Sequence, residues 1–125
     1  MSEEVLEIIS SMMKSLALKY SFMELKGKPE YPYFTGEYLE TPSQGEEGMQ
    51  EGTFILTGHA RNSWEALESA KRIIKNHITK AGKMVTTANG SVVAIFYENS
   101  TPVKSVDKEL KKIQINLKIK EWSVT

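Results

Sequence analysis

Residues 52–78 carry the sequence GTFILTGHARNSWEALESAKRIIKNHI, which predicts a strand, a short turn and a helix in direct succession. Residues 53–60 are rich in β-branched and aromatic side chains, which suit a pleated strand. Alternation along this strand places four residues on one face: Phe54, Leu56, Gly58 and Ala60. The helix that follows carries an apolar stripe at helical spacing, made of Ala66, Leu67, Ala70, Ile73, Ile74 and Ile78. Such a stripe has to be buried, and a sheet is the expected partner.

The two ends of this helix have recognisable signals. Asn62 is a candidate N-cap, because its side-chain oxygen can accept from a backbone N–H of the first turn and Glu65 completes a capping-box spacing. Ser63 is an equally suitable cap one residue later. Gly82 is the expected stop.

The sequence before this unit predicts one helix and one strand. The helix begins after Ser2, an expected cap, and its apolar residues continue at helical spacing as far as Tyr20. A break follows at residues 26–29, and residues 31–40 are expected to form a strand. Residues 41–51, TPSQGEEGMQE, are expected to form a long acidic hairpin loop.

The sequence after the helix predicts three more strands. Residues 83–88 and 91–98 flank Asn89 and Gly90, a strong hairpin signal, and residues 99–110 are expected to be a polar connection. The last segment alternates most cleanly, with Ile113, Ile115, Leu117 and Ile119 on one face. The order α-β-β-α-β-β-β predicts an α+β fold, with two helices packed on one face of an antiparallel sheet. We expect one domain spanning residues 1–125.

The sequence offers no recognisable catalytic or cofactor motif. It has no cysteine, and its two histidines, His59 and His77, have no metal-ligand spacing. We therefore expect no enzyme activity, no metal and no cofactor. The acidic residues near the N-terminus do not resemble a signal peptide, and no apolar run is long enough for a membrane span, so a soluble protein is expected.

Charge is balanced overall but unevenly distributed. The chain has 16 basic and 16 acidic residues, yet residues 1–70 hold five basic and 12 acidic ones. The two halves could pair within one molecule or between molecules. A second class, nucleic-acid binding, is suggested by six lysines with two aromatic residues for stacking: Lys104, Lys108, Lys111, Lys112, Lys118, Lys120, Tyr97 and Trp122.

The chain resembles the tail-terminator, tail-completion and head–tail joining proteins of long-tailed bacteriophages. The resemblance rests on the helix that ends before Tyr31-Pro32-Tyr33-Phe34 and on the long hairpin loop at residues 41–51. It continues with the strand 52–61, which leads directly into the helix 63–78, and with the amphipathic strand 111–122. It covers most of the chain.

The resemblance implies a structural, non-enzymatic protein of a virion or prophage. Members form rings, commonly hexamers, that cap the tail tube or join it to the head. The implied partners are further copies of the chain, the phage tail tube and head-connector proteins, without a membrane. DNA would pass through the lumen without specific binding, and assembly would take place in the bacterial host cytoplasm.

A ring built by head-to-tail contacts would use different patches on the two sides of each subunit. The charge asymmetry suggests Glu37 and Glu40 for the acidic patch and Lys104, Lys108 and Lys111 for the basic patch. The expected hairpin loop would face the lumen with Glu46, Glu47, Met49 and Glu51. A small nucleic-acid-binding domain or a regulatory ligand-binding domain of α+β class remains the alternative.

Overall fold

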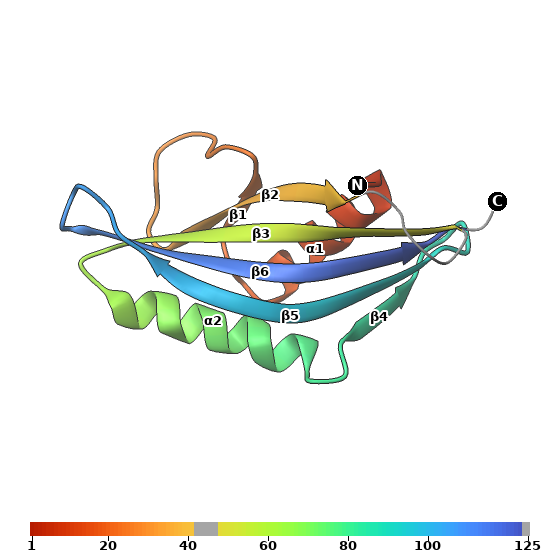
Figure 1. Cartoon of the computed structure of the whole chain (residues 1–125). Helices are drawn as coiled ribbons and strands as arrows, with labels where there is room; N and C mark the ends of the chain where they lie inside the picture. The colour runs from red at the N-terminus through yellow and green to blue at the C-terminus, as the bar shows by residue number, and fades with distance from the viewer. Residues whose placement is uncertain (42–47, 124–125) are drawn as a thin grey trace.

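The structure, a computed structural model, describes residues 1–41 and 48–123 (Figure 1). It has an α+β fold in which two helices accompany a curled six-stranded sheet with the strand order β1-β2-β3-β6-β5-β4. The elements are α1 (Glu3–Ser15), β1 (Tyr20–Phe22), β2 (Tyr33–Thr41), β3 (Met49–Arg61), α2 (Trp64–Ile78), β4 (Lys83–Thr86), β5 (Val92–Val103) and β6 (Leu110–Trp122).

The first edge of the sheet corrects the expectation of a purely antiparallel sheet. β1 pairs with β2 in parallel, with Tyr20 opposite Phe34, so the sheet is mixed and the element order contains one strand more than expected. The reason lies in the preceding helix, which ends at Ser15 instead of continuing to Tyr20. Ala17 takes a left-handed backbone conformation with φ 59°, which turns the chain out of the helix. A short apolar segment fits either a helix or a strand, so its spacing could not distinguish them.

The hairpin between β2 and β3 is longer in its strands and shorter in its loop than expected. The ladder continues to Thr41 opposite Glu51, and Met49 is already opposite Trp122 of β6. Met49 and Glu51 were therefore wrongly expected in a loop. β3 pairs with β2 on one side and with β6 on the other. The hydrogen bonds to β6 join backbone groups and do not require alternating apolar side chains, so no side-chain pattern indicates that β3 begins at Met49. Glu46 and Glu47 lie outside the described residues.

The connection expected at residues 99–110 is also largely strand. β5 continues to Val103 through a register shift between Tyr97 and Asn99, with Pro102 opposite Ile113 of β6. Only residues 104–109 remain between the two strands, and they form the tip of a long hairpin (Figure 1).

The core forms where the alternating strands predicted it. Phe54 and Leu56 of β3 are buried, together with the four alternating residues of the last strand, Ile113, Ile115, Leu117 and Ile119. One cluster combines them with buried side chains from both helices: Val5, Ile9, Met12 and Met13 of α1, and Leu67, Ala70, Ile74 and Ile78 of α2. Ile73 was wrongly placed in the buried stripe, since it is 43% exposed.

The start of α2 shows which of the two candidates, Asn62 or Ser63, is the N-cap. Ser63 caps α2, and its hydroxyl oxygen accepts from the backbone N–H of Ala66 at 3.2 Å. Asn62 instead takes a positive φ of 60° in the turn out of β3. The helix ends at Ile78, before Gly82, because Thr79 already adopts a left-handed conformation.

Candidate interaction surfaces

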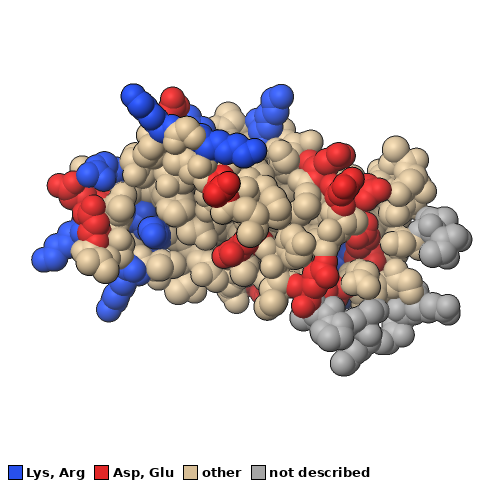
Figure 2. All heavy atoms as spheres, turned by 90° about the horizontal axis from the view of Figure 1, so that it is seen from above, with Lys and Arg blue, Asp and Glu red and all other residues tan. Residues whose placement is uncertain are grey.

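The long strands run between two ends of the molecule that differ in charge. Figure 2 shows acidic side chains gathered toward one end, while lysine and arginine predominate toward the other. The first end holds the N-terminus of α1 and the last residues of β6, and the second holds the tip of the β5–β6 hairpin (Figure 1).

The basic end brings together the three lysines expected to form one patch. Lys104, Lys108 and Lys111 border a hollow of about 340 Å³ that Trp64 also lines. The Lys111 ammonium lies 5.7 Å from the Trp64 ring centroid, and it donates a hydrogen bond to the Lys108 carbonyl oxygen. We call these four residues the basic patch. Sequence reasoning missed Trp64, and the only signal for it was a tryptophan directly after the helix cap, because its exposure of 41% is a property of the folded chain.

The carboxylates of the hairpin tip are engaged locally. Glu109 pairs with Arg61 at 3.1 Å, and the Asp107 side-chain oxygen accepts from the backbone N–H of Glu109 at 2.9 Å. Within the described residues, Lys104 and Lys108 have no ion pair. Val106, between them in sequence, has a relative exposure of 105%. The tip therefore presents two free ammonium groups beside one fully exposed apolar side chain.

The two acidic residues expected opposite this patch do not form a common surface. Glu37 and Glu40 are three residues apart on β2, and successive side chains of a strand alternate between its faces. Glu37 lies opposite Ile55, whereas Glu40 lies opposite Gly52 and pairs with the N-terminal ammonium group of Met1. The expectation of one Glu37–Glu40 patch is therefore wrong.

The described residues once expected at the lumen belong to the sheet ladder. Glu51 pairs with Lys118 at 2.9 Å, and the hydrogen bond from this lysine lowers the pKa of the Glu51 carboxyl. The same hydrogen bond raises the pKa of Lys118. Glu51 also borders a hollow of about 320 Å³ with Glu40 and Glu121. Glu121 is 93% buried by relative area and accepts a hydrogen bond from the Ser2 hydroxyl at 2.7 Å.

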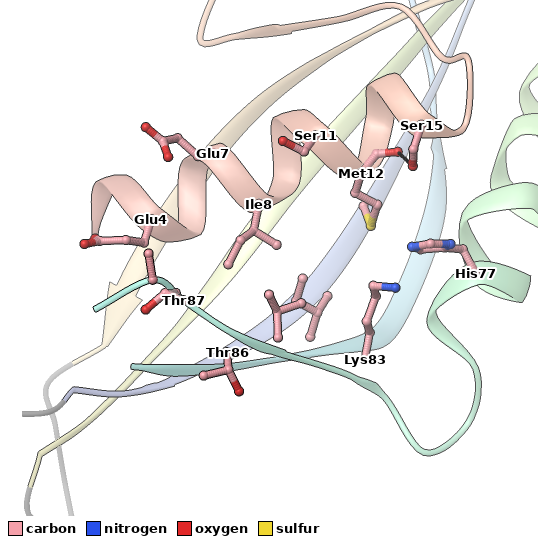
Figure 3. A pocket seen from close by; sticks show the side chains of 13 residues that line it. Glu4, Glu7, Ile8, Ser11, Met12, Ser15, His77, Lys83, Thr86 and Thr87 are labelled. Carbon is pink, nitrogen blue, oxygen red and sulfur yellow. Dashed lines mark hydrogen bonds between the residues drawn. The ribbon is translucent and has the colours of Figure 1, made fainter. Parts of the chain in front are cut away.

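A second hollow at the acidic end is a groove between α1 and β4, which we call the α1–β4 groove (Figure 3). It encloses about 540 Å³. Its apolar lining comes from Ile8, Met12, Val85 and Ile95, and its polar lining comes from Glu4, Glu7, Ser11, Ser15, His77, Lys83, Thr86 and Thr87. The sequence did not indicate this groove, because α1 and β4 are far apart in the chain.

The two ends of the groove differ in charge. Glu4 accepts a hydrogen bond from the Asn89 side chain at 3.0 Å, whereas the Glu7 carboxylate has no ion pair or hydrogen bond with any described residue. At the other end His77 and Lys83 lie side by side (Figure 3). Desolvation, followed by the nearby Lys83 charge, lowers the pKa of His77, so its neutral form is favoured.

The lysines of the nucleic-acid alternative do not share one aromatic platform. Lys118 is paired with Glu51, and Lys111 belongs to the basic patch. Tyr97 packs against the core and lies 5.1 Å beneath the Lys75 ammonium. The outer face of the sheet does hold one aromatic stack, in which the Tyr33 and His59 rings are 4.5 Å apart. Burial, followed by the Lys112 charge, lowers the pKa of His59.

The described residues contain neither a candidate membrane-spanning helix nor a cluster of potential metal ligands. None of the helices in that part of the chain is long and apolar enough to cross a membrane. Across residues 1–41 and 48–123, no three His, Cys, Asp or Glu side chains gather closely enough to hold a metal ion.

Comparisons with known proteins give a likeness in fold only. The chain matches no protein-family model and no curated protein sequence. Among the solved structures that match, one aligns over 100% of this chain and 99% of its own with a TM-score of 0.64. The two sequences are 14% identical, so the likeness shows a shared fold and no function.

Proposed function

We propose that this chain is a non-enzymatic structural protein of a bacteriophage or prophage. It forms a ring, as a hexamer, at the end of the tail tube or at the head–tail junction. Its partners are further copies of the chain, the tail tube and the head connector, and DNA passes through the ring without specific binding. The observation that carries the proposal is the separation of charge between the two ends of the molecule.

A closed ring needs a heterologous interface, in which one patch of each subunit contacts a different patch of the next. The basic patch and the carboxylates near α1 give the two ends such different surfaces. β3 and β6 have 13 residues each, and a rise of about 3.3 Å per residue makes them about 40 Å long. Opposite charges held this far apart are better placed to meet on neighbouring subunits than within one subunit.

The proposal includes the finer arrangement expected from the sequence, with both helices on the same face of the curled sheet. The single core cluster to which both helices contribute supports this arrangement. The opposite face then remains uncovered in the isolated subunit. It carries polar side chains of β3 and β6 such as Thr57 and Gln114, which are directly opposite in the ladder.

The test is complementation in a phage or prophage that encodes the chain. Disrupting the gene should give tails of irregular length, or separate heads and tails, in electron micrographs, and a plasmid copy should restore normal particles. The Lys104→Glu/Lys108→Glu variant should fail to restore them. Lys26→Glu/Lys28→Glu is the matched control, since it reverses two exposed charges that do not belong to the basic patch. Normal particles without the gene would overturn the proposal.

A further inference from the structure

We propose that the β5–β6 hairpin tip of one copy docks in the α1–β4 groove of a second copy, with Val106 seated among the apolar lining residues. The inference rests on the ring assembly proposed above and identifies the surfaces through which subunits meet. It also replaces the Glu37–Glu40 patch with Glu4 and Glu7 as the acidic partners of the tip lysines.

The groove has the size and chemistry for a hairpin tip. Its volume of about 540 Å³ exceeds that of one side chain and accommodates a tight turn. Met12 and Ile95 are buried in its floor, while Ile8 and Val85 are partly exposed. Seating a valine among them removes apolar surface from water on both molecules, and full burial of such a side chain is favourable.

The charges of the tip and the groove are complementary. Glu109 is paired with Arg61 and the Asp107 side chain accepts a backbone N–H, whereas the ammonium groups of Lys104 and Lys108 have no ion pair among the described residues. The groove presents Glu7 without a partner among the described residues and Glu4 with a single hydrogen bond from Asn89. Lysines on either side of Val106 in sequence can reach the acidic rim when the valine is seated.

The free edge of β4 offers hydrogen bonds to a docked backbone. The Thr87 N–H donates to the Ser91 carbonyl oxygen at 2.8 Å, which makes this pair a hydrogen-bonded one. Hydrogen-bonded and non-hydrogen-bonded pairs alternate in an antiparallel ladder, so the N–H and C=O groups of Met84 and Thr86 point away from β5. β4 is the edge strand of the sheet, and unpaired edge groups can bind an added extended segment.

One molecule cannot make this contact with itself. β5 begins at Val92, beside the groove, and ends at Val103, beside the tip. Its 12 residues separate the two surfaces by about 36 Å at the rise of an extended strand. The tip must therefore enter the groove of another copy, and the contact is heterologous, as a ring requires.

Single cysteines provide the test, because the chain has none of its own. Val106→Cys would be co-produced with Ser11→Cys, whose site lines the groove. The matched control pairs Val106→Cys with Ser69→Cys, an exposed position on α2 outside the groove. A short bismaleimide is applied both to concentrated protein and to particles isolated from the complemented phage. We expect a cross-linked dimer with Ser11→Cys and at least ten-fold less with Ser69→Cys.

A charge reversal provides the second arm. Glu7→Lys should weaken self-association at least ten-fold, and combining it with Lys104→Glu and Lys108→Glu should restore most of the loss. The docking inference is overturned, while ring formation stands, if native mass spectrometry shows rings but Val106→Cys cross-links equally to Ser11→Cys and Ser69→Cys. It is also overturned if rings form and Glu7→Lys has no effect on self-association. If the protein stays monomeric and particles form normally without it, the proposed function fails as well.

Discussion

Ile115 is fully buried and Val106 is fully exposed, with relative exposures of 0% and 105%. Ile115→Ala leaves a cavity in the core and should lower the free energy of unfolding by about 2–5 kcal/mol. Val106→Ala removes atoms that contact only solvent and should change it by less than about 0.5 kcal/mol. Urea denaturation of both variants measures the difference. Equal losses would mean that the assigned face of β6 is wrong.

Tyr20 has a hydroxyl that is buried without a hydrogen-bond partner among the described residues. Burial raises its pKa to about 12, above the usual value of 10.0. At neutral pH, Tyr20→Phe removes an unsatisfied polar group, so the melting temperature should stay equal or rise.

The alkaline behaviour of Tyr20 follows from the same burial. The unfolded chain loses the phenolic proton from pH 10.0 upward, whereas the folded chain retains it until about pH 12. The free energy of unfolding of the wild type should therefore decrease as the pH rises through this window, and that of Tyr20→Phe should decrease less. Thermal melts between pH 9 and pH 12 measure the two slopes. Identical slopes would show that Tyr20 is accessible to solvent.

Individual residues were predictable from the sequence where one periodic pattern decided their position. The alternation of the last strand correctly placed Ile113, Ile115, Leu117 and Ile119 in the core, because a shift of one residue would have exposed all four. Glu37 and Glu40 were paired on charge alone, without applying the same alternation to β2. The contact of Glu4 with Asn89 and the position of Glu7 at the groove could not be predicted, since both depend on where the β4–β5 hairpin lies against α1.

The glycines of β3 leave room for side chains and backbone of neighbouring segments to pack closely against this strand. A Cβ on Gly58 would lie 2.7 Å from a Phe34 ring carbon and 3.0 Å from the Ile113 Cγ2. Gly58→Ala should therefore destabilise the fold by about 1–3 kcal/mol through overpacking. Gly52→Ala, whose nearest neighbours lie at 3.1 and 3.2 Å, is the control with the smaller expected loss. Chemical denaturation that ranks Gly52→Ala as the more damaging change would contradict this account.

Elements were predictable where a long pattern coincided with a local signal. The sequence indicated the β3–α2 unit and the turn at Asn89-Gly90 because periodicity and turn residues agree there. It missed β1, with only three residues, the first three residues of β3 and the last five residues of β5. These segments are strands because neighbouring strands supply their backbone hydrogen bonds, and that tertiary cause leaves little trace in side-chain pattern.

The uneven charge of the two halves of the sequence corresponds to a difference in charge between the two ends of the folded molecule. The acidic first half contributes α1, and the basic second half contributes the hairpin tip. The sequence predicted the grouping of Lys104, Lys108 and Lys111, because they are close in the chain. It could not predict the groove, whose lining spans residues 4–95.

In head-to-tail association each subunit uses two different surfaces, the tip and the groove, so the two can be blocked separately. A tip-blocked variant, Val106→Asp, retains a working groove, and a groove-blocked variant, Ser11→Trp, retains a working tip. Each variant alone should be monomeric, because its remaining surface finds no complementary one.

An equal mixture should therefore form dimers and nothing larger, since only the intact tip and the intact groove can meet and both outer surfaces of that dimer are blocked. Native mass spectrometry at increasing concentration, with wild type as the ring-forming reference, measures the species. Lys26→Asp mixed with Ser69→Trp is the matched control, because both changes lie at exposed positions outside the tip and the groove, and these variants should still form full rings. Dimers in either single-variant sample would indicate a two-fold interface elsewhere and contradict head-to-tail assembly.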